Sequence, residues 1–378
     1  MVASPRFRGG QVAADAVLAT LDVTGYARTR NEVWPPGRRG ASAVSPYVRH
    51  GLLPLPLLWD AVADAPARDR ATYRDELLWQ EFSRHLYARL GPATRDGLRR
   101  RLAGAELDGR EPWDRSMACL EVTGDELETD GWLVNQTRMW LASHWAVREG
   151  VDWRDGEDRF FRHLLDGSRA ANRAGWQWTV GTATGRPYGF SRWQVEKRAP
   201  GLCGTCVHER DCPIDDWPQD PPLGPADEPA RLRDDPDPDG TAGPTTPVVD
   251  GDAEVVWLTA ESLGDDDPAL AAHPDLPVAF VFDAALLAHL RLSGKRLVFL
   301  TETLADLAAR RDVEVHLGDP VQVLAGRRLA TTHAPVPGWR RRAAHLTVVA
   351  THPWPWLAHP HGGPVTSFSA WRKRLPPR

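Results

Sequence analysis

The 378-residue sequence contains no apolar run long enough to cross a bilayer, and its first residues, MVASPRFRGG, do not resemble a signal peptide. We therefore expect a cytoplasmic protein with no membrane partner. Only four cysteines are present, and because disulfides rarely persist in the cytosol, we do not expect a disulfide framework. No G-x-G-x-x-G sequence follows the first strand-like run, which argues against a standard dinucleotide site there.

Neither sign of charge dominates, since the formal net charge is −5. The charge is unevenly spread: residues 213–252 hold 11 acidic and 2 basic residues, whereas the remainder holds 44 basic and 40 acidic residues. That remainder permits a local basic groove for nucleic acid without requiring one. The acidic stretch is rich in Pro and Asp and poor in apolar residues, and we interpret it as a disordered or extended linker.

Tryptophan is abundant, with 17 copies. Several lie in residues 131–178, which begin GWLVNQTRMWLASHW with the apolar spacing of a helix and end in a second helical run, after a turn at 166–168. Arg138 can hold a carboxylate or phosphate in a bidentate geometry. Together with Asp166 and the tryptophans, it would suit a planar, anionic redox cofactor. A tryptophan-rich helical core with a structural Arg138–Asp166 pair is the alternative.

The last third of the chain has a different pattern, in which short apolar runs alternate with helical stretches. This alternation predicts a doubly wound, parallel α/β sheet. The predicted strands lie in residues 253–260, 277–283, 296–302, 313–319 and 343–351.

Several runs resemble hallmarks of the photolyase/cryptochrome family, GWMHNRxRM, DWRxGE, LxDGDxAANxGGWQW and PYF. This chain has GWLVNQTRM, DWRDGE, LLDGSRAANRAGWQW and PYG, in the family's order, over most of residues 1–195. The resemblance implies an all-helical FAD-binding domain over residues 1–212, an acidic linker over 213–252, and a short, Rossmann-like α/β domain over 253–378.

The α/β part resembles the family's antenna domain, which begins VVWFRRDLRLxDNPAL where this chain has VVWLTAESLGDDDPAL. That domain comes first in the family, so the reversed order implies a circular permutation, with the linker joining the old ends. The FRRDLR arginines are absent, since residues 258–264 read LTAESLG. The antenna chromophore is therefore either absent or of unknown identity.

The resemblance also implies a set of FAD contacts. Asn135, Arg138 and Asp166 match contacts to the isoalloxazine or ribityl groups, and Asn172 matches the residue that faces flavin N5. Gln80 replaces an Arg that contacts the flavin phosphates in the family. The whole expected set comprises Tyr26, Ser42, Ala43, Ser45, Tyr73, Glu76, Gln80, Trp132, Asn135, Arg138, Asp166, Ser168 and Asn172.

In this family a reduced flavin, excited by blue light, passes an electron to a UV-induced pyrimidine dimer flipped out of DNA. The resemblance makes Glu76, Asn135, Asn172, Trp176 and Trp153 the catalytic residues, the two tryptophans as members of an electron-feeding chain. Core packing is the alternative for the tryptophans, and a solvated helix position is the alternative for Glu76.

Trp79, Met139 and Trp178 match contacts to the lesion or the DNA. Repair of (6-4) lesions normally uses a His where this chain has Val134, so we expect repair of cyclobutane dimers by a lyase that acts as a monomer on UV-damaged DNA. The alternative function is a cryptochrome-like blue-light sensor that binds FAD without repair.

The cysteines have a one-plus-three layout, with Cys119 before the GW run and Cys203, Cys206 and Cys212 after the helical stretch. This layout resembles a bacterial branch of the family that carries a [4Fe–4S] cluster, although the last spacing is short for that branch. A zinc site that includes His208 and a set of unliganded thiols remain alternatives.

Overall fold

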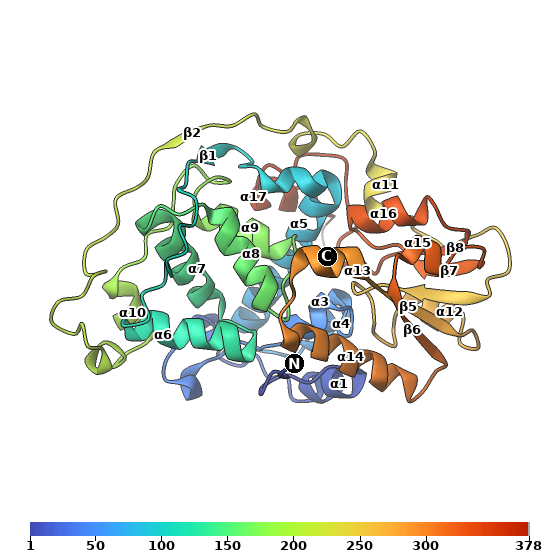
Figure 1. Ribbon diagram of the computed structural model, residues 1–378, viewed down its shortest axis with the longest axis horizontal. Helices are drawn as coiled ribbons and strands as arrows, with labels where there is room; N and C mark the ends of the chain where they lie inside the picture. The colour runs from blue at the N-terminus through green and yellow to red at the C-terminus, as the bar shows by residue number, and fades with distance from the viewer. Residues whose placement is uncertain (377–378) are drawn as a thin grey trace.

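The computed structural model describes residues 1–376. A helical part is followed by a mostly parallel sheet with its own helices, so these two features of the predicted fold class are present (Figure 1). Within the described chain, none of the helices combines the length and the apolar character needed to span a bilayer.

The helical part contains ten α-helices, and the longest connection runs from α5 to α6. In chain order they are α1 (Gln11–Ala19), α2 (Tyr26–Thr29), α3 (Ser45–Arg49), α4 (Leu55–Ala61), α5 (Ala67–Leu90), α6 (Ala118–Asp125), α7 (Asn135–Ser143), α8 (Trp153–His163), α9 (Ala171–Thr179) and α10 (Arg192–Arg198). Single π-type turns, η3 (Glu126–Asp130) and η4 (His144–Arg148), extend α6 and α7. Such turns locally widen a helix and are frequent near functional sites.

The main sheet has six strands in the order β3-β8-β7-β4-β5-β6. All neighbours are parallel except β3, which pairs antiparallel with β8 at one edge. The strands are β3 (Val248–Val249), β4 (Val255–Leu258), β5 (Val278–Asp283), β6 (Val313–Gly318), β7 (Leu329–Thr332) and β8 (Val348–His352). Strands β5 and β6 are added on one side of β4, and β7 and β8 are added on its other side. The carboxyl ends of β4 and β7 therefore form a topological switch point.

The helices of the α/β part are α12 (Pro268–Ala272), α13 (Ala284–Leu290), α14 (Gly294–Ala308), α15 (Pro320–Val323) and α16 (Pro337–Ala343). The predicted strand at 296–302 is wrong, because these residues lie inside α14. Phe299, Leu300, Thr303, Leu304 and Leu307 are buried at three- and four-residue spacing, so the apolar run belongs to one helix face. Strand β7 was not predicted from its short, mixed sequence.

The acidic segment 213–252 is an extended chain held at several points rather than a free tether. Its β2 (Leu223–Pro225) pairs with β1 (Arg100–Leu102), and α11 (Pro238–Ala242) lies near its end. Asp235 forms a fully buried ion pair with Arg89 of α5, whose guanidinium also donates to the Gly363 carbonyl at 2.7 Å. The segment thereby connects the helical part to the carboxyl-terminal residues.

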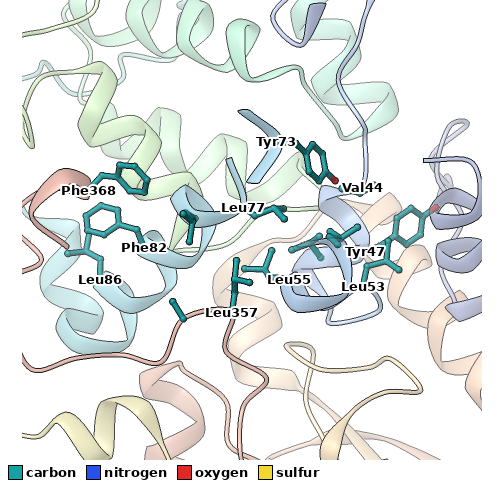
Figure 2. Packing of buried hydrophobic residues seen from close by; sticks show 14 of the residues in the cluster. Val44, Tyr47, Leu53, Leu55, Tyr73, Leu77, Phe82, Leu86, Leu357 and Phe368 are labelled. Atoms are coloured by element: carbon teal, nitrogen blue, oxygen red, sulfur yellow. The ribbon is translucent and has the colours of Figure 1, made fainter. Parts of the chain in front are cut away.

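The largest hydrophobic core is built from both ends of the chain (Figure 2). Tyr73, Leu77 and Phe82 of α5 pack with α3 on one side. On the other side they meet Leu357 and Phe368, the latter on α17 (Phe368–Arg372). Part of the predicted second domain is therefore built into the core of the first.

His50 lies at the boundary between the helical part and the sheet, and only 2% of it is exposed. Its Nδ1 lies 2.7 Å from the Ala260 carbonyl oxygen, consistent with a donated hydrogen bond. Burial lowers the pKa of His50 from 6.5 to about 3. The folded state therefore binds this proton less tightly than the unfolded chain, so the stability that neutral His50 contributes is complete above pH 6.5 and is lost as the pH falls toward 3.

At pH 5 this loss is about 2 kcal/mol. We expect the fall in unfolding free energy between pH 7 and pH 5 to be smaller in His50→Gln by about that amount. Urea titrations at the two pH values measure it. His289→Gln, which changes an exposed histidine, is the matched control. An unaltered pH dependence in His50→Gln would contradict this assignment.

Candidate functional site

A cleft of about 1270 Å³, open to solvent on one side, lies among α2, α3, α5, α7 and α9. The structure brings to it every predicted FAD-binding residue except Ser168. The predicted residues that line it are Tyr26, Ser42, Ala43, Ser45, Tyr73, Glu76, Gln80, Trp132, Asn135, Arg138, Met139, Asp166, Asn172 and Trp176. Residues spread over about 150 positions of sequence thus face one space.

Arg138 and Asp166 form a bidentate ion pair inside the cleft, with N–O distances of 2.7 and 3.2 Å. Asp166 also accepts a hydrogen bond of 2.5 Å from the Ser45 hydroxyl, which in turn accepts one of 3.0 Å from the Trp132 indole. Arg138 donates further to the Leu133 carbonyl at 3.1 Å. The guanidinium is therefore largely committed to the protein, and its main effect is to fix the Asp166 carboxylate.

Glu76 stands on the cleft side of α5 and forms an ion pair of 3.1 Å with Arg30. Burial raises the pKa of Glu76, and the nearby Arg30 partly offsets that shift. Arg30 also lines the cleft, although the sequence analysis did not single it out. It follows α2 by one residue, where its charge can compensate for the neutral Gln80.

The loop before α3 carries a strained residue: Ala43 has φ +55°, in the left-handed region that non-glycine residues rarely adopt. Ala43 and its neighbours Ala41, Ser42 and Val44 all line the cleft. Backbone strain of this kind, about 1 kcal/mol or more, is concentrated at ligand sites. The strain lies in the loop that carries Ser42 and leads to Ser45, two of the predicted FAD contacts.

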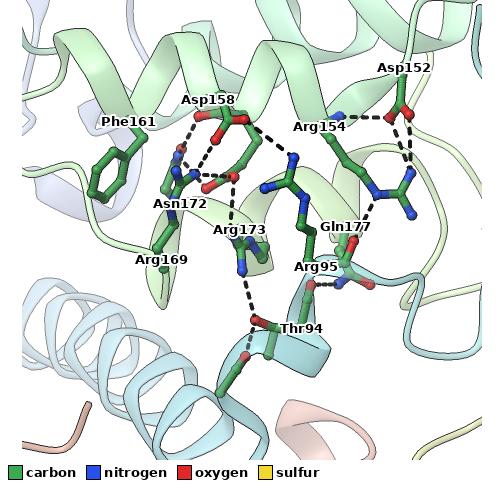
Figure 3. Close-up of polar contacts among 12 residues, drawn as sticks. Thr94, Arg95, Asp152, Arg154, Asp158, Phe161, Arg169, Asn172, Arg173 and Gln177 are labelled. Atoms are coloured by element: carbon green, nitrogen blue, oxygen red, sulfur yellow. Dashed lines mark hydrogen bonds and ion pairs between the residues drawn. The ribbon is translucent and has the colours of Figure 1, made fainter. Parts of the chain in front are cut away.

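Asn172 at the start of α9 is fixed by a buried polar network (Figure 3). Its Nδ2 donates to the carboxylate and the backbone carbonyl of Glu157, both at 3.2 Å. The same carboxylate pairs with Arg169 at 2.5 Å and Arg173 at 3.3 Å. Burial raises the pKa of Glu157, and the two arginines oppose that shift. Because both donor bonds go to Glu157, the amide carbonyl of Asn172 is the group left for a ligand.

Trp176 lies at the base of the cleft against α8. A Cβ atom on Gly156 would meet its ring at 2.2 Å, and the Phe160 ring lies 5.1 Å away between centroids. Trp153 is buried on α8, one turn before Gly156, and does not line the cleft. Of the two tryptophans predicted to form the electron-feeding chain, Trp176 borders the cleft and Trp153 does not.

Three further predicted residues lie outside the cleft. The Ser168 hydroxyl accepts a 3.0 Å hydrogen bond from the Ala171 N–H at the start of α9, and Ser168 borders a different cavity. Trp79 and Trp178 are 38% and 41% exposed on the surface. Trp178 lies 6.0 Å from the Tyr188 ring, whose hydroxyl accepts from Gln136.

Gly189 of the PYG run has a neighbour that accounts for its small size. The Trp217 ring, from the acidic segment, lies where a Gly189 Cβ would approach it to 2.4 Å. Trp217, 28 positions further along the chain, therefore occupies the space that an aromatic side chain at position 189 would need.

The four cysteines line one small pocket between α6, α10 and the η5 turn (Cys203–Thr205). Burial, together with the three other thiols, raises the pKa of Cys119 to about 12. Cys206 Sγ accepts a 3.4 Å hydrogen bond from the Ala118 N–H. His208 shares a 2.7 Å hydrogen bond with Ser116. Over residues 1–376, no three His, Cys, Asp or Glu side chains have the geometry of a metal site. The thiols converge without forming a closed site.

A second, larger cavity of about 2450 Å³ lies where the carboxyl ends of β4 and β5 face the helical part. Its walls include Trp257, Phe282, Arg84, Arg173 and Ser168. No local sequence pattern predicts this cavity, because it forms between segments that lie far apart along the chain.

Comparisons with known proteins agree on the helical part. Residues 73–195 match the FAD binding domain of DNA photolyase. This photolyase-type segment supplies α5, α7, α8 and α9, and therefore most of the cleft wall. The match supports FAD as the ligand of the cleft.

Curated relatives carry the name deoxyribodipyrimidine photo-lyase. The chain is 30% identical over 166 residues to that of a Synechococcus species, with 38% of this chain and 33% of the relative covered. It is 29% identical over 208 residues to that of Vibrio cholerae, with 49% and 43% covered. For Escherichia coli the identity is 32% over 162 residues, with 39% and 34% covered. The chain thus spans well under half the length of these curated relatives.

Among solved structures, a bacterial class III photolyase from Agrobacterium tumefaciens is 26% identical with a TM-score of 0.40, and the match covers 45% of this chain and 37% of that one. A Synechocystis cryptochrome is 23% identical with a TM-score of 0.47, covering 52% and 44%.

Proposed function

We propose that this protein binds FAD in the cleft and uses it for light-driven repair of cyclobutane pyrimidine dimers in DNA. The convergence of the predicted FAD residues on one cleft carries the proposal. Reduced FAD, when bound, would supply the light-excited electron that splits the dimer, and would receive it back. The protein binds the cofactor, keeps water from it and presents the lesion.

The residues of the cleft fit such a cofactor. Asn172 offers a fixed amide carbonyl to a ring N–H, and the Arg138–Asp166 pair sets a carboxylate beside it. Arg30 and the loop around Ser42 provide charge and hydroxyl donors for a diphosphate. Glu76 sets a carboxyl group on the cleft side of α5, held by Arg30 at 3.1 Å, where it could contact a pyrimidine of the lesion.

The test uses purified protein with its flavin reduced by blue light. A thymine-dimer oligonucleotide is added, and restored thymines are counted with and without illumination. Light-dependent repair supports the proposal. Flavin photoreduction without repair of this substrate would favour the alternative, a blue-light sensor, and absence of flavin would contradict both.

We also propose that Trp176 is the first internal electron donor to photoexcited flavin. Trp176→Phe should slow photoreduction several-fold, since phenylalanine is much harder to oxidise. The measurement is the rate of flavin bleaching under constant blue light with an external reductant. Trp140→Phe is the matched control, because Trp140 is fully buried against Phe190 outside the cleft. Equal rates in wild type and Trp176→Phe would exclude this role.

For the cysteines we propose a structural [4Fe–4S] cluster held by Cys119, Cys203, Cys206 and Cys212. Their convergence on one pocket supports it, and the Ser116 bond of His208 makes that histidine a poorer alternative ligand. We further propose that the α/β part is an antenna-type domain moved behind the flavin domain by circular permutation. The sheet order and the packing of residues 357–371 into the helical core are compatible with that origin.

A further inference from the structure

The surface beside the cleft contains an aromatic stack formed by two distant parts of the chain. Trp79 follows Glu76 by three residues on α5, so it stands about one turn from the cleft wall. The Phe368 ring of α17 stacks on Trp79 at 3.9 Å between centroids and 11° between planes. Phe368 is buried, whereas Trp79 is 38% exposed. One face of the indole is therefore covered, and its exposed area belongs to the opposite face and edge.

Contacts with α5 fix the position of α17. Trp371 is fully buried and its indole N–H donates to His85 Nδ1 at 2.8 Å. Arg372 forms an ion pair with Asp75, in the same turn of α5 as Glu76. Phe82 of α5 lies edge-on to Phe368. The Phe368 ring is thus part of a rigid support, and it holds the Trp79 ring in one orientation.

Two positively charged residues come directly after α17 in the sequence. Lys373 and Arg374 are exposed and form no ion pair within residues 1–376. No Asp or Glu occurs anywhere from residue 320 to the end of the sequence. Asp75 of α5, a carboxylate that contacts α17, is paired with Arg372. The exposed end of α17 therefore carries positive charge a few residues from the ring that stacks on Trp79.

We propose that α17 and the two residues after it form part of the DNA-binding surface, with Phe368 supporting Trp79 as a stacking platform and Lys373 and Arg374 binding backbone phosphates. This inference rests on the proposed function for the identity of the nucleic acid. Proteins bind single-stranded or flipped nucleotides mainly by stacking aromatic side chains on the bases and by contacting the phosphates with basic side chains. The platform places them side by side, about one helical turn from the carboxylate of Glu76.

The test measures the dark binding of flavin-loaded protein to two labelled duplexes, one with a single thymine dimer and one undamaged, by fluorescence anisotropy over a range of salt concentrations. Lys373→Ser should weaken binding to both duplexes and make the plot of log K against log salt shallower by about 1. Lys197→Ser is the matched control, because Lys197 is an exposed lysine on α10, far from α17 (Figure 1).

Phe368→Leu keeps an apolar side chain but removes the ring stack. It should weaken binding to the damaged duplex roughly fivefold, with little effect on the undamaged one. Phe368→Tyr keeps the ring and should bind as wild type. Thermal unfolding of both variants shows whether a loss arises from misfolding, and Phe368→Tyr tests the platform even if Phe368→Leu is unstable.

The outcomes separate this inference from the proposed function. An unchanged salt slope in Lys373→Ser, measured on undamaged DNA, overturns the phosphate contact whether or not repair occurs. Wild-type-like damage preference in folded Phe368→Leu, or loss of that preference in folded Phe368→Tyr, overturns the platform. Repair by the wild type together with either result would leave the proposed function intact and remove only α17 from it.

Discussion

Asp166→Ala is expected to yield a folded protein almost free of flavin. The change removes the acceptor of both Arg138 and Ser45 and leaves a guanidinium unpaired in the cleft. Removing one partner of a largely buried ion pair costs about 3 kcal/mol or more, which corresponds to roughly a hundredfold weaker binding. The flavin absorbance per protein, measured after desalting, reports this directly.

Asp227→Ala is the matched control. Asp227 forms an ion pair with Arg101 on the surface, and its side chain is fully exposed. We expect no change in its flavin content. Circular dichroism of both variants shows whether the helical content is preserved. Wild-type flavin content in Asp166→Ala would mean that the Arg138–Asp166 pair supports the fold and not the cofactor.

If the proposed [4Fe–4S] cluster is present, Cys119→Ala should eliminate it. Cys119 is the only one of the four thiols supplied by the segment before α7, and it is buried. The proposed cluster would then keep only the thiols of Cys203, Cys206 and Cys212, which lie in one short segment, and would lose its ligand from α6. We expect iron and acid-labile sulfide to fall to background and soluble yield to drop, since metal binding contributes to folding.

Ser116→Ala tests the zinc alternative in the same region, because it releases His208 from its hydrogen bond and leaves every thiol in place. Iron content should remain that of the wild type. Zinc in place of iron in the wild type, or full iron in Cys119→Ala, would contradict a four-cysteine [4Fe–4S] cluster.

The cleft could be predicted from sequence because its residues lie in contiguous runs whose order and spacing are distinctive. The sequence predicts Tyr73, Asn135 and Asp166 as FAD contacts, and all three line the cleft. Arg30 was missed because it lies in no such run. Ser168 lines the neighbouring cavity instead, and its hydroxyl accepts from the α9 backbone, a local hydrogen bond that sequence matching does not weigh.

The α/β part shows a second reason for error. The run at 296–302 has the composition of a buried strand. Its apolar residues continue at helical spacing to Leu307, and this periodicity is not visible within the seven residues alone. The contact between Trp217 and Gly189 and the stack between Phe368 and Trp79 join residues 28 and 289 positions apart. Such contacts depend on tertiary packing, which local pattern does not encode.

The contribution of Leu357, Phe368 and Trp371 to the core around α5 has a consequence for synthesis of the protein. A ribosome releases the helical part long before it reaches these residues, and domains ordinarily fold as they emerge. In this protein the apolar side chains of Phe82 and Leu86 on α5 remain partly exposed to solvent until residues 357–371 have been synthesised. Nascent chains should therefore be vulnerable to aggregation and proteases late into translation, and flavin should be acquired only after that final segment has docked.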